Sequence, residues 1–511
     1  MEVPLTIRDH LERAAIVYGN RVGIVDEPDQ PAPGLGALTY AETFERARSL
    51  AAGLESLGVE QGSRVAVVSQ NAARLLLSLY GVSGWGRVCV PVNFRLNADE
   101  VQYIVDHSGA EVVLIDPELA DAHADLQAQQ KFVIGADTDE VIFRPDLEPR
   151  DWAADESSTA TINYTSGTTS RPKGVEMTHR NLWVNAATFG WQTGVNDRDV
   201  YLHTLPMFHC NGWGMPYALA GMGAKQIVLR QVDGAEILRR VDEHGVTLLC
   251  GAPAVVAGIL DAGQQWDGPI PGAGRTRMVV AGAPPPTQTI ERMETELGWE
   301  FIQIYGLTET APLLTMSRTR AEYDDLSPTE RARKLGRAGA PALGIRLKTD
   351  ASGEVLAQGN VVLKSYWDQP EASADALDGG WFHTGDGGVI DDENHLTILD
   401  RKKDVIISGG ENVSSIEVED TLFSHPAVAE VAVIGVPDQK WGETVKALVV
   451  LAVDEQATEA DLIEHCRQKL AHFKCPTSVE IRDELPRTAT GKLQKFKLRK
   501  KYWEGRERAI N

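Results

Sequence analysis

The first quarter of the chain alternates helical and apolar strand patterns, and this limits the possible folds more than any other feature. The predicted elements are helices at 41–57, 72–81 and 98–108, and β-branched strands at 64–68, 89–92 and 111–116. Apolar strands separated by helices are typical of a parallel sheet that is covered by helices on both faces. We therefore expect an α/β protein built on a doubly wound sheet.

Length and composition bound the class of protein. A chain of 511 residues is long enough for two or more domains. Its net charge of −23 argues against nucleic-acid or anionic-membrane partners, which require basic surfaces. Five cysteines without Cys-x-x-Cys spacing indicate free thiols in a reducing compartment rather than a disulfide framework or a zinc site.

The sequence shows no pattern typical of a targeting signal or a membrane span. The first ten residues carry charges where a signal peptide needs an apolar core, and the apolar stretch 75–85 is too short to span a bilayer. The last residues, 509–511, match neither a prenylation nor a peroxisomal signal. We therefore expect a cytoplasmic protein without membrane insertion.

The loop from Thr165 to Gly174 reads TSGTTSRPKG and follows a predicted strand. Glycine lets backbone N–H groups approach phosphate oxygens closely, hydroxyls add donors, and Lys173 supplies positive charge. The spacing differs from that of a Walker A loop. A flexible linker is the alternative, but a linker does not need the Arg-Pro-Lys-Gly ending. The residues that follow, 175–181, favour a helix.

Two later stretches place chemistry beside predicted strand ends. Residues 206–213 bring aromatic side chains, His209 and a glycine together, which can form an apolar pocket with one polar group. A strand end in the core with a satisfied histidine is the alternative. After the strand 301–305, Tyr305 can stack on a purine and Glu309 is a hard oxygen ligand suited to Mg²⁺. A helix cap is the alternative there.

The last third of the chain adds three candidates. Asp386 follows a glycine at a strand end, where a carboxylate can accept both ribose hydroxyls, although it can equally occupy an ordinary turn. The charged run 400–412 suits a domain boundary or a solvated surface. Lys492, in a glycine-containing loop, can stabilise charge in phosphoryl or adenylyl transfer, whereas most such lysines are merely exposed.

These motifs, in this order, are similar to those of the adenylate-forming superfamily: acyl-CoA synthetases, adenylation domains of peptide synthetases and luciferases. The resemblance covers nearly the whole chain. It includes Thr165–Gly174, the Pro-x-Phe-His stretch, Gly282–Pro284, Tyr305–Thr310, Thr384–Asp386, the run 400–412 and Pro486–Lys492. The chain departs from the family at Ser170, where glycine is usual. With the Phe-His-Cys-Asn-Gly-Trp form, this departure resembles a subgroup that activates short-chain, medium-chain or benzoate-like acids.

The resemblance implies a fold and a reaction. The expected fold is a large N-terminal domain, residues 1–403, of doubly wound sheets plus a closing β-barrel, followed by a small mobile α+β domain, residues 404–511. The expected reaction is ATP-dependent, with Mg²⁺, and converts a carboxylic acid through acyl-AMP into acyl-CoA. An enzyme that loads a carrier protein is the alternative, and a non-catalytic nucleotide or acyl-CoA sensor is a second one. A homodimer is common in the family.

The resemblance also implies the site residues, position by position. ATP and AMP would be bound by Thr165, Ser166, Gly167, Thr168, Thr169, Lys173, Gly282, Ala283, Pro284, Gln303, Tyr305, Gly306, Thr308, Asp386, Arg401 and Lys492. The catalytic residues would be His209, Thr308, Glu309 and Lys492, with Glu309 and Thr165 at the metal. The acyl pocket would include His209, Trp213, Gly282 and Gly306. CoA would contact Ser408, Gly409, Gly410, Glu411 and Lys474, and Lys403 would be the hinge.

The acid itself is not identified by these motifs. Three aromatic side chains near the His209 stretch, Phe189, Trp191 and Trp213, would shorten the acyl pocket if they line it. A short pocket favours small or aromatic acids over long fatty chains.

Overall fold

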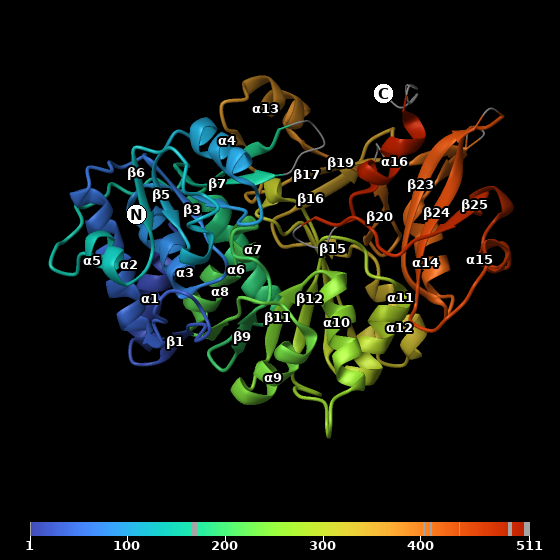
Figure 1. Ribbon diagram of the computed structural model, residues 1–511, viewed down its shortest axis with the longest axis horizontal. Helices are drawn as coiled ribbons and strands as arrows, with labels where there is room; N and C mark the ends of the chain where they lie inside the picture. Colours follow the sequence, from blue (N-terminus) through green and yellow to red (C-terminus); the bar gives the residue numbers. More distant parts are fainter. Residues whose placement is uncertain are drawn as a thin grey trace.

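The computed structural model describes residues 2–165, 171–401, 404–408, 411–438, 440–488 and 493–504. Along its long axis the N-terminal part lies at one end and the C-terminal domain at the other (Figure 1). Eight residues predicted for the site lie outside the described residues, namely Ser166, Gly167, Thr168, Thr169, Lys403, Gly409, Gly410 and Lys492. Within the described part of the chain, no helix is both long and apolar enough to cross a bilayer.

A seven-stranded sheet carries the predicted N-terminal pattern. Its order is β18 (Ser365–Tyr366), β8 (Lys173–Thr178), β7 (Thr159–Thr165), β4 (Val88–Val92), β3 (Arg64–Val68), β5 (Ala110–Ile115) and β6 (Gln130–Val133). The strands from β7 to β6 are parallel, whereas β8 and β18 are antiparallel to their neighbours. The predicted helices are present as α2 (Tyr40–Ser56), α3 (Ala73–Gly81) and α4 (Ala98–Ser108).

A nine-stranded sheet forms the middle of the molecule. Its order is β15 (Ala340–Pro341), β14 (Thr315–Arg318), β13 (Glu300–Tyr305), β12 (Arg277–Val280), β11 (Leu248–Gly251), β9 (Val200–His203), β10 (Lys225–Val228), β1 (Val22–Val25) and β2 (Ala37–Thr39). The strands from β13 to β1 are parallel, and the edge strands β2, β14 and β15 are antiparallel. The carboxyl ends of the parallel strands therefore lie at one edge.

The other helices of this region connect and cover the two sheets. They are α1 (Arg8–Tyr18), α5 (Ala136–Ile142), α6 (His179–Thr193), α7 (Cys210–Trp213), α8 (Met215–Met222), α9 (Gly234–His244), α10 (Pro253–Gln264), α11 (Thr287–Arg292), α12 (Pro328–Leu335) and α13 (Pro370–Ala376). Local sequence fixes several of their starts. Thr39 and Glu42 form a capping box at α2, and Thr178 and Asn181 form one at α6.

The strands alternate their side chains between two cores, as a doubly wound sheet requires. In β3, Val65 and Val67 pack in the core shared by the two sheets, while Ala66 and Val68 pack on the opposite face. In β11, Leu249 packs away from the shared core, in a cluster with residues of α9 and α10. Burial on both faces explains the continuous apolar runs that the sequence shows.

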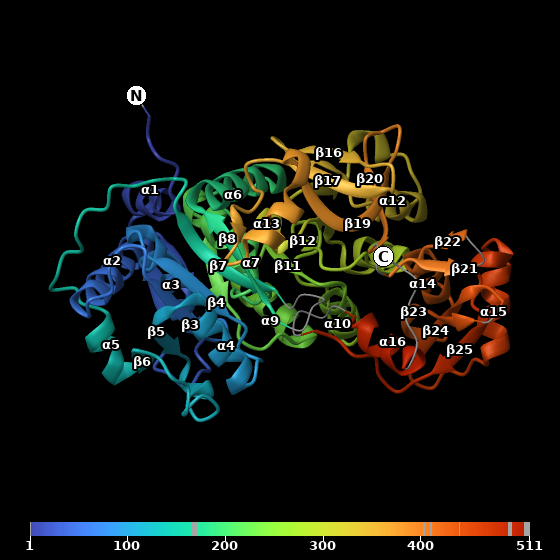
Figure 2. The same cartoon turned by 90° about the horizontal axis from the view of Figure 1, so that it is seen from above.

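Two smaller sheets complete the fold, and both lie on the C-terminal side of the large sheets (Figure 2). One, where a barrel was expected, has the open order β16 (Arg346–Thr349), β17 (Glu354–Gln358), β19 (Phe382–Ile390) and β20 (Leu396–Arg401). The C-terminal α+β domain contains β21 (Ile406–Ser408), β22 (Glu411–Val413), β23 (Val428–Asp438), β24 (Gly442–Leu451), β25 (Ser478–Ile481), α14 (Ser415–Phe423), α15 (Glu459–Arg467) and α16 (Lys495–Trp503).

One secondary-structure prediction was wrong in part. The segment 175–181 was expected to favour a helix, but residues up to Thr178 belong to β8, because Val175 and Met177 enter the core and their backbone pairs with β7. The helix begins only at His179.

A buried amide joins the two large sheets. Asn71 follows β3, and its Nδ2 donates to the carbonyls of His203, Leu205 and Leu229 at 3.0, 3.0 and 3.2 Å. Its Oδ1 accepts from the backbone N–H of Met207 at 2.8 Å. One side chain thus satisfies backbone groups that follow β9 and β10, at the edge where the carboxyl ends of both sheets meet.

Replacing this amide should destabilise the protein. We expect Asn71→Ala to lower the free energy of unfolding by about 2–3 kcal/mol, because buried backbone groups lose their partner. Urea unfolding followed by circular dichroism measures the change. Asn196→Ala, at an exposed asparagine, should change it by less than about 1 kcal/mol. Equal midpoints for the two variants would contradict this role of Asn71.

Candidate active site

Four of the predicted residues lie at or beside strand ends that face one another. Tyr305 ends β13 and Thr165 ends β7, while Lys173 begins β8 and Arg401 ends β20. Parallel α/β sheets bind ligands outside the carboxyl ends of their strands. The predicted site therefore occupies the position that this fold class favours.

Asp386, Tyr305 and Arg401 form one contact group. The hydroxyl of Tyr305 donates to Asp386 Oδ2 at 2.8 Å, and Arg401 Nε lies 3.5 Å from Asp386 Oδ1. Burial, followed by the charge of Asp386, raises the pKa of Tyr305 well above its ordinary value, so the phenol stays protonated. Asp386 is itself buried. The group joins the nine-stranded sheet to the four-stranded sheet.

Glu309 and Lys173 both contact Tyr366, a residue outside the motifs named above. Glu309 lies in a short 3₁₀ turn, Thr308–Thr310, directly after β13 and Gly306-Leu307. Its Oε1 accepts from the hydroxyl of Tyr366 at 3.0 Å. Lys173 Nζ lies 4.7 Å from the centroid of the same tyrosine ring. Burial and the charge of Glu309 raise the pKa of Tyr366 above its ordinary value, so this phenol also stays protonated.

The His209 stretch has an unusual backbone. Cys210, Asn211, Gly212 and Trp213 all have positive φ, at 47°, 52°, 61° and 60°. A left-handed conformation costs a non-glycine residue about 1–2 kcal/mol, so this turn must be held by its surroundings. The Asn211 amide bonds to Thr161 at 3.1 Å and to Asn163 at 3.2 and 3.3 Å.

This turn places two side chains beside the other candidates. The thiol of Cys210 donates to Thr308 Oγ1 at 3.2 Å and lies 3.9 Å from His209 Nε2. Trp213 is buried, and its carbonyl accepts from Asn185 Nδ2 at 3.1 Å. His209 and Thr308 are thus brought together through Cys210, which the motif interpretation did not single out.

The remaining predicted nucleotide residues differ in their surroundings. Gly282, Ala283 and Pro284 are exposed in the turn after β12. Gln303 is buried, and its amide lies beside the carbonyls of Leu335 and Gly336, to which its nitrogen donates at 3.2 and 3.3 Å when the amide is turned so that the nitrogen faces them. The structure therefore brings Gln303 to the end of α12 and not to the Tyr305 hydroxyl.

The predicted CoA residues that are described lie in the C-terminal domain. Ser408 and Glu411 pair across the β21–β22 hairpin, and Lys474 forms an ion pair with Glu417 at 2.7 Å. The two domains touch where Asp420 accepts from the backbone N–H of Thr287 at 2.9 Å.

The aromatic residues expected to shorten the acyl pocket do not behave alike. Phe189 and Trp213 are buried, whereas Trp191 is 73% exposed and lies on the outer surface of α6. The expectation for Trp191 was wrong, because the residue occupies the solvent side of an amphipathic helix.

Two hollows lie near these strands. One, of about 270 Å³, is lined by Gln70, Asn71, Phe94, Arg95, Pro206, Arg230, Gln231 and Val232. It adjoins the His209 turn, since the rings of Phe94 and Phe208 are 5.6 Å apart in an edge-on contact. Arg230 also pairs with Asp116 at 2.8 Å and with Glu118 at 2.7 Å.

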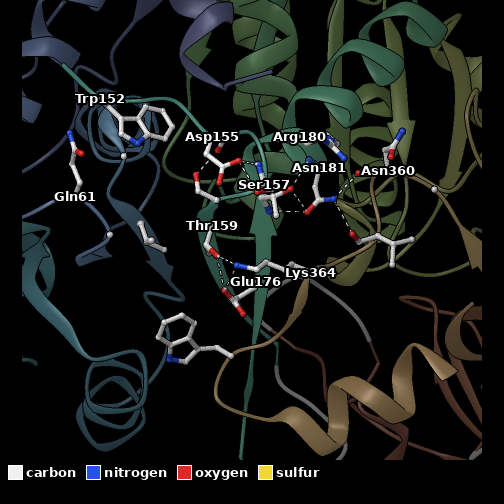
Figure 3. Close-up of a pocket in the computed structure, with 18 residues that line it drawn as sticks. Gln61, Trp152, Asp155, Ser157, Thr159, Glu176, Arg180, Asn181, Asn360 and Lys364 are labelled. Atoms are coloured by element: carbon white, nitrogen blue, oxygen red, sulfur yellow. Dashed lines mark hydrogen bonds and ion pairs between the residues drawn. The ribbon is translucent and has the colours of Figure 1, made fainter. Parts of the chain in front are cut away.

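The second hollow, of about 830 Å³, lies at the opposite end of β7 and β8 (Figure 3). Its lining includes Trp152, Thr159, Glu176, Arg180 and Lys364, and none of the predicted site residues is among the groups that line it. This cavity is therefore separate from the candidate site. Among the described residues, no group of three histidine, cysteine or acidic side chains is arranged to hold a metal by itself.

Comparison with known proteins identifies the family. Residues 11–367 match the family described as AMP-binding enzyme, and residues 417–492 match the family described as AMP-binding enzyme C-terminal domain. The chain is 37% identical to 2-methylpropanoate–CoA ligase CCL4 of Humulus lupulus, covering 97% of this chain and 95% of that protein. It is 35% identical to the peroxisomal acetate/butyrate–CoA ligase AAE7 of Arabidopsis thaliana, covering 96% and 93%.

Solved structures give the same result. The fold superimposes on the anthranilate CoA ligase AuaEII in complex with anthranoyl-AMP with a TM-score of 0.87, at 27% identity over 98% of this chain and 99% of that one. It superimposes on O-succinylbenzoate coenzyme A synthetase (MenE) of Bacillus subtilis, in complex with ATP and magnesium ion, with a TM-score of 0.81. That match has 28% identity and covers 96% of this chain and 99% of that one.

The turn after Tyr305 should not tolerate a side chain at Gly306. A Cβ there would lie 1.5 Å from the carbonyl oxygen of Pro312, so Gly306→Ala should lower the free energy of unfolding by about 1–3 kcal/mol. Gly258→Ala, where a Cβ meets nothing within 4 Å in helix α10, should leave stability unchanged or raise it by up to about 1 kcal/mol. Urea unfolding of both variants tests the difference, and equal stability would contradict the close approach.

Proposed function

This chain belongs to the family of AMP-binding enzymes, and we propose that it is an ATP-dependent acyl-CoA ligase that releases AMP and pyrophosphate. The observation that carries the proposal is the convergence of Tyr305, Asp386, Arg401, Lys173 and Glu309 from separate parts of the sequence. The CoA-ligase names of the relatives support CoA as the acceptor.

The first half-reaction activates the acid. A carboxylate is a poor acylating agent because its leaving group would be an oxide. One carboxylate oxygen attacks the α-phosphorus of ATP, the bond to the bridging oxygen breaks, and pyrophosphate leaves with that electron pair. Lys173 and the loop Thr165–Thr169 hold the β- and γ-phosphates. Lys492 lies between the carboxylate and the α-phosphate and stabilises the charge that develops there, with Thr308 contacting the α-phosphate.

The nucleoside is held by the Asp386 group. A carboxylate offers about four lone-pair positions, so Asp386 can accept from ribose hydroxyls while it accepts from Tyr305. Tyr305 packs against adenine, Arg401 faces the ribose, and the exposed turn Gly282–Pro284 lines the opening. Gln303 supports the nucleoside site from the core side, where its amide lies beside the carbonyls at the end of α12.

Magnesium fits this site as a partner of ATP. Mg²⁺ is usually held by one or two carboxylates together with substrate phosphates, so a single carboxylate such as Glu309 is sufficient, and the hydroxyl of Thr165 would be a second protein ligand. The ion would neutralise phosphate charge. The residues present therefore fit the ion without a preformed cage of protein ligands.

The acid is a short linear or branched carboxylic acid. The proposed acyl pocket includes His209, Trp213, Gly282 and Gly306, and the indole of Trp213 is buried. The acids named for the two relatives, 2-methylpropanoate and acetate or butyrate, are of this size. A closed pocket rejects a longer chain because extra methylene groups have no space to occupy.

The second half-reaction transfers the acyl group to CoA. The CoA thiol loses its proton, its sulfur attacks the acyl carbonyl carbon, and AMP leaves with the electrons of the C–O bond. We place the domain boundary at residues 403 and 404, with Lys403 as the hinge. Rotation of residues 404–511 withdraws Lys492 and presents Ser408–Glu411 and Lys474 to CoA, which requires the Asp420–Thr287 contact to break.

Two other functions make different predictions. An enzyme that loads a carrier protein would release pyrophosphate but would show no dependence on CoA. A nucleotide or acyl-CoA sensor would release no pyrophosphate at all. Location in the cytoplasm and assembly as a homodimer remain predictions.

The experiment that tests the proposal is AMP formation with ATP and Mg²⁺ over a panel of acids, with and without CoA. We expect turnover that depends on both the acid and CoA, with 2-methylpropanoate or butyrate better than octanoate by at least about tenfold. Pyrophosphate release that ignores CoA would point to a carrier protein. No acid-dependent release would overturn the proposal.

The two half-reactions should separate in one variant. Lys492→Ala should slow acyl-AMP formation by about 10²–10³-fold while keeping most thioester formation from supplied acyl-AMP and CoA, because the lysine acts only at the α-phosphate. Lys497→Ala, an exposed lysine on α16, is the matched control and should leave both rates unchanged. Equal loss of both half-reactions in the Lys492 variant would contradict its assigned role.

A further inference from the structure

Tyr366 stands between the cation and the anion of the proposed site. Its hydroxyl donates to Glu309 Oε1 at 3.0 Å, and Lys173 Nζ lies 4.7 Å from its ring centroid. Lys173 belongs to the phosphate loop, and Glu309 follows β13 in the other large sheet. One side chain therefore contacts both charged groups, although it lies in none of the motifs that identify the site.

The chain around Tyr366 is fixed on both sides. The N–H of Leu363 donates to the carbonyl of Glu309 at 2.7 Å, and the N–H of Trp367 donates to the carbonyl of Gly174 at 2.7 Å. Tyr366 itself pairs with Val175 in β8, and its N–H donates to Ser373 Oγ at 2.9 Å. This short segment, residues 363–367, ties the turn that carries Glu309 to the strand that carries Lys173.

The buried carboxylate of Glu176 also holds this segment in place. Glu176 of β8 accepts from Thr159 Oγ1 at 2.7 Å and from Ser365 Oγ, and Lys364 Nζ lies 3.7 Å away. Glu176, Thr159 and Lys364 line the 830 Å³ hollow, and there they point toward one another (Figure 3). The anchor fixes Ser365, and through it the position of the next residue.

The chemistry of a tyrosine suits this place. A lysine and a glutamate this close to one tyrosine would gain Coulomb energy by forming a direct ion pair, and a paired lysine and carboxylate would be less available to phosphates and Mg²⁺. The ring attracts the ammonium group without neutralising it, and the phenol holds one carboxylate oxygen without a charge. A carboxylate that is held by one oxygen can coordinate a cation through the other.

We propose that Tyr366 is a positioning residue of the adenylation half-reaction. Its hydroxyl orients Glu309, and its ring keeps Lys173 from forming an ion pair with Glu309. This inference rests on the proposed function. It adds a residue to the site and assigns the two ends of that residue separate tasks.

The test separates those tasks with two substitutions. Tyr366→Phe keeps the ring and loses the hydroxyl. We expect it to raise the Mg²⁺ concentration for half-maximal acyl-AMP formation by about tenfold, while the rate at saturating Mg²⁺ falls less than about threefold. Tyr366→Leu also loses the ring, and it should in addition raise KM for ATP by about tenfold in a way that excess Mg²⁺ does not restore.

Two controls distinguish positioning from general damage. Tyr323→Phe removes a hydroxyl that accepts from Arg337 at 2.7 Å and lies outside the proposed site. This variant should leave the Mg²⁺ requirement unchanged. Thioester formation from supplied acyl-AMP should stay within about twofold of the parent protein in both Tyr366 variants, because that step does not use the pyrophosphate site.

A binding measurement makes the test independent of turnover. Calorimetry of ATP binding with and without Mg²⁺ should show a smaller Mg²⁺-dependent gain in affinity for Tyr366→Phe than for the parent protein, by about tenfold. An unchanged gain and an unchanged Mg²⁺ requirement would overturn the proposal. A parent protein that binds Mg²⁺-ATP but activates no acid would instead overturn the proposed function, and the binding comparison would still decide the role of Tyr366.

Discussion

The site depends on two tyrosines that hold the carboxylates of Asp386 and Glu309 beside cations. Asp386 pairs with Arg401 at 3.5 Å, and a shared phenol separates Glu309 from Lys173. In both places a tyrosine hydroxyl donates to the carboxylate, and burial keeps that hydroxyl protonated. A protonated phenol can orient an anion without adding charge. Each carboxylate is therefore oriented for its proposed partner, a ribose for Asp386 and a metal ion for Glu309, and Lys173 keeps its charge for its proposed partner, a phosphate.

A second constraint is the left-handed turn at Cys210–Trp213. Four consecutive residues with positive φ would not form in isolation, and three of them have side chains. Buried amides supply the compensation, because Asn211 bonds to Asn163 and Thr161, and Asn185 bonds to the carbonyl of Trp213. The turn brings Cys210 against Thr308 and buries Trp213 at the same time. The conformation of this turn, which carries residues of the proposed acyl pocket, is therefore fixed by polar groups of the core, and aromatic packing alone does not set it.

The sequence predicted the parts of the fold that depend on local patterns. Continuous apolar runs rich in β-branched residues placed β3 and β5. Prediction from the sequence failed where contacts between residues far apart in the sequence determine the local structure. Residues up to Thr178 form a strand because β7 lies beside them, and Trp191 is exposed because of the face it occupies on α6. Tyr366 had no signal at all, since its function comes from Glu309 and Lys173, which lie far from it in sequence.

The net charge shows a similar limit. A protein with a formal charge of −23 repels ATP and CoA at long range, yet the proposed site handles both polyanions. Salt screens charges beyond about 8 Å at physiological ionic strength, so affinity is decided by the few groups within that distance. Lys173 and Arg401 belong to the proposed site, and Arg95 and Arg230 line the neighbouring hollow. Total charge therefore argues against partners that need a broad basic surface, such as nucleic acid, but does not argue against a small anion that is bound in a pocket.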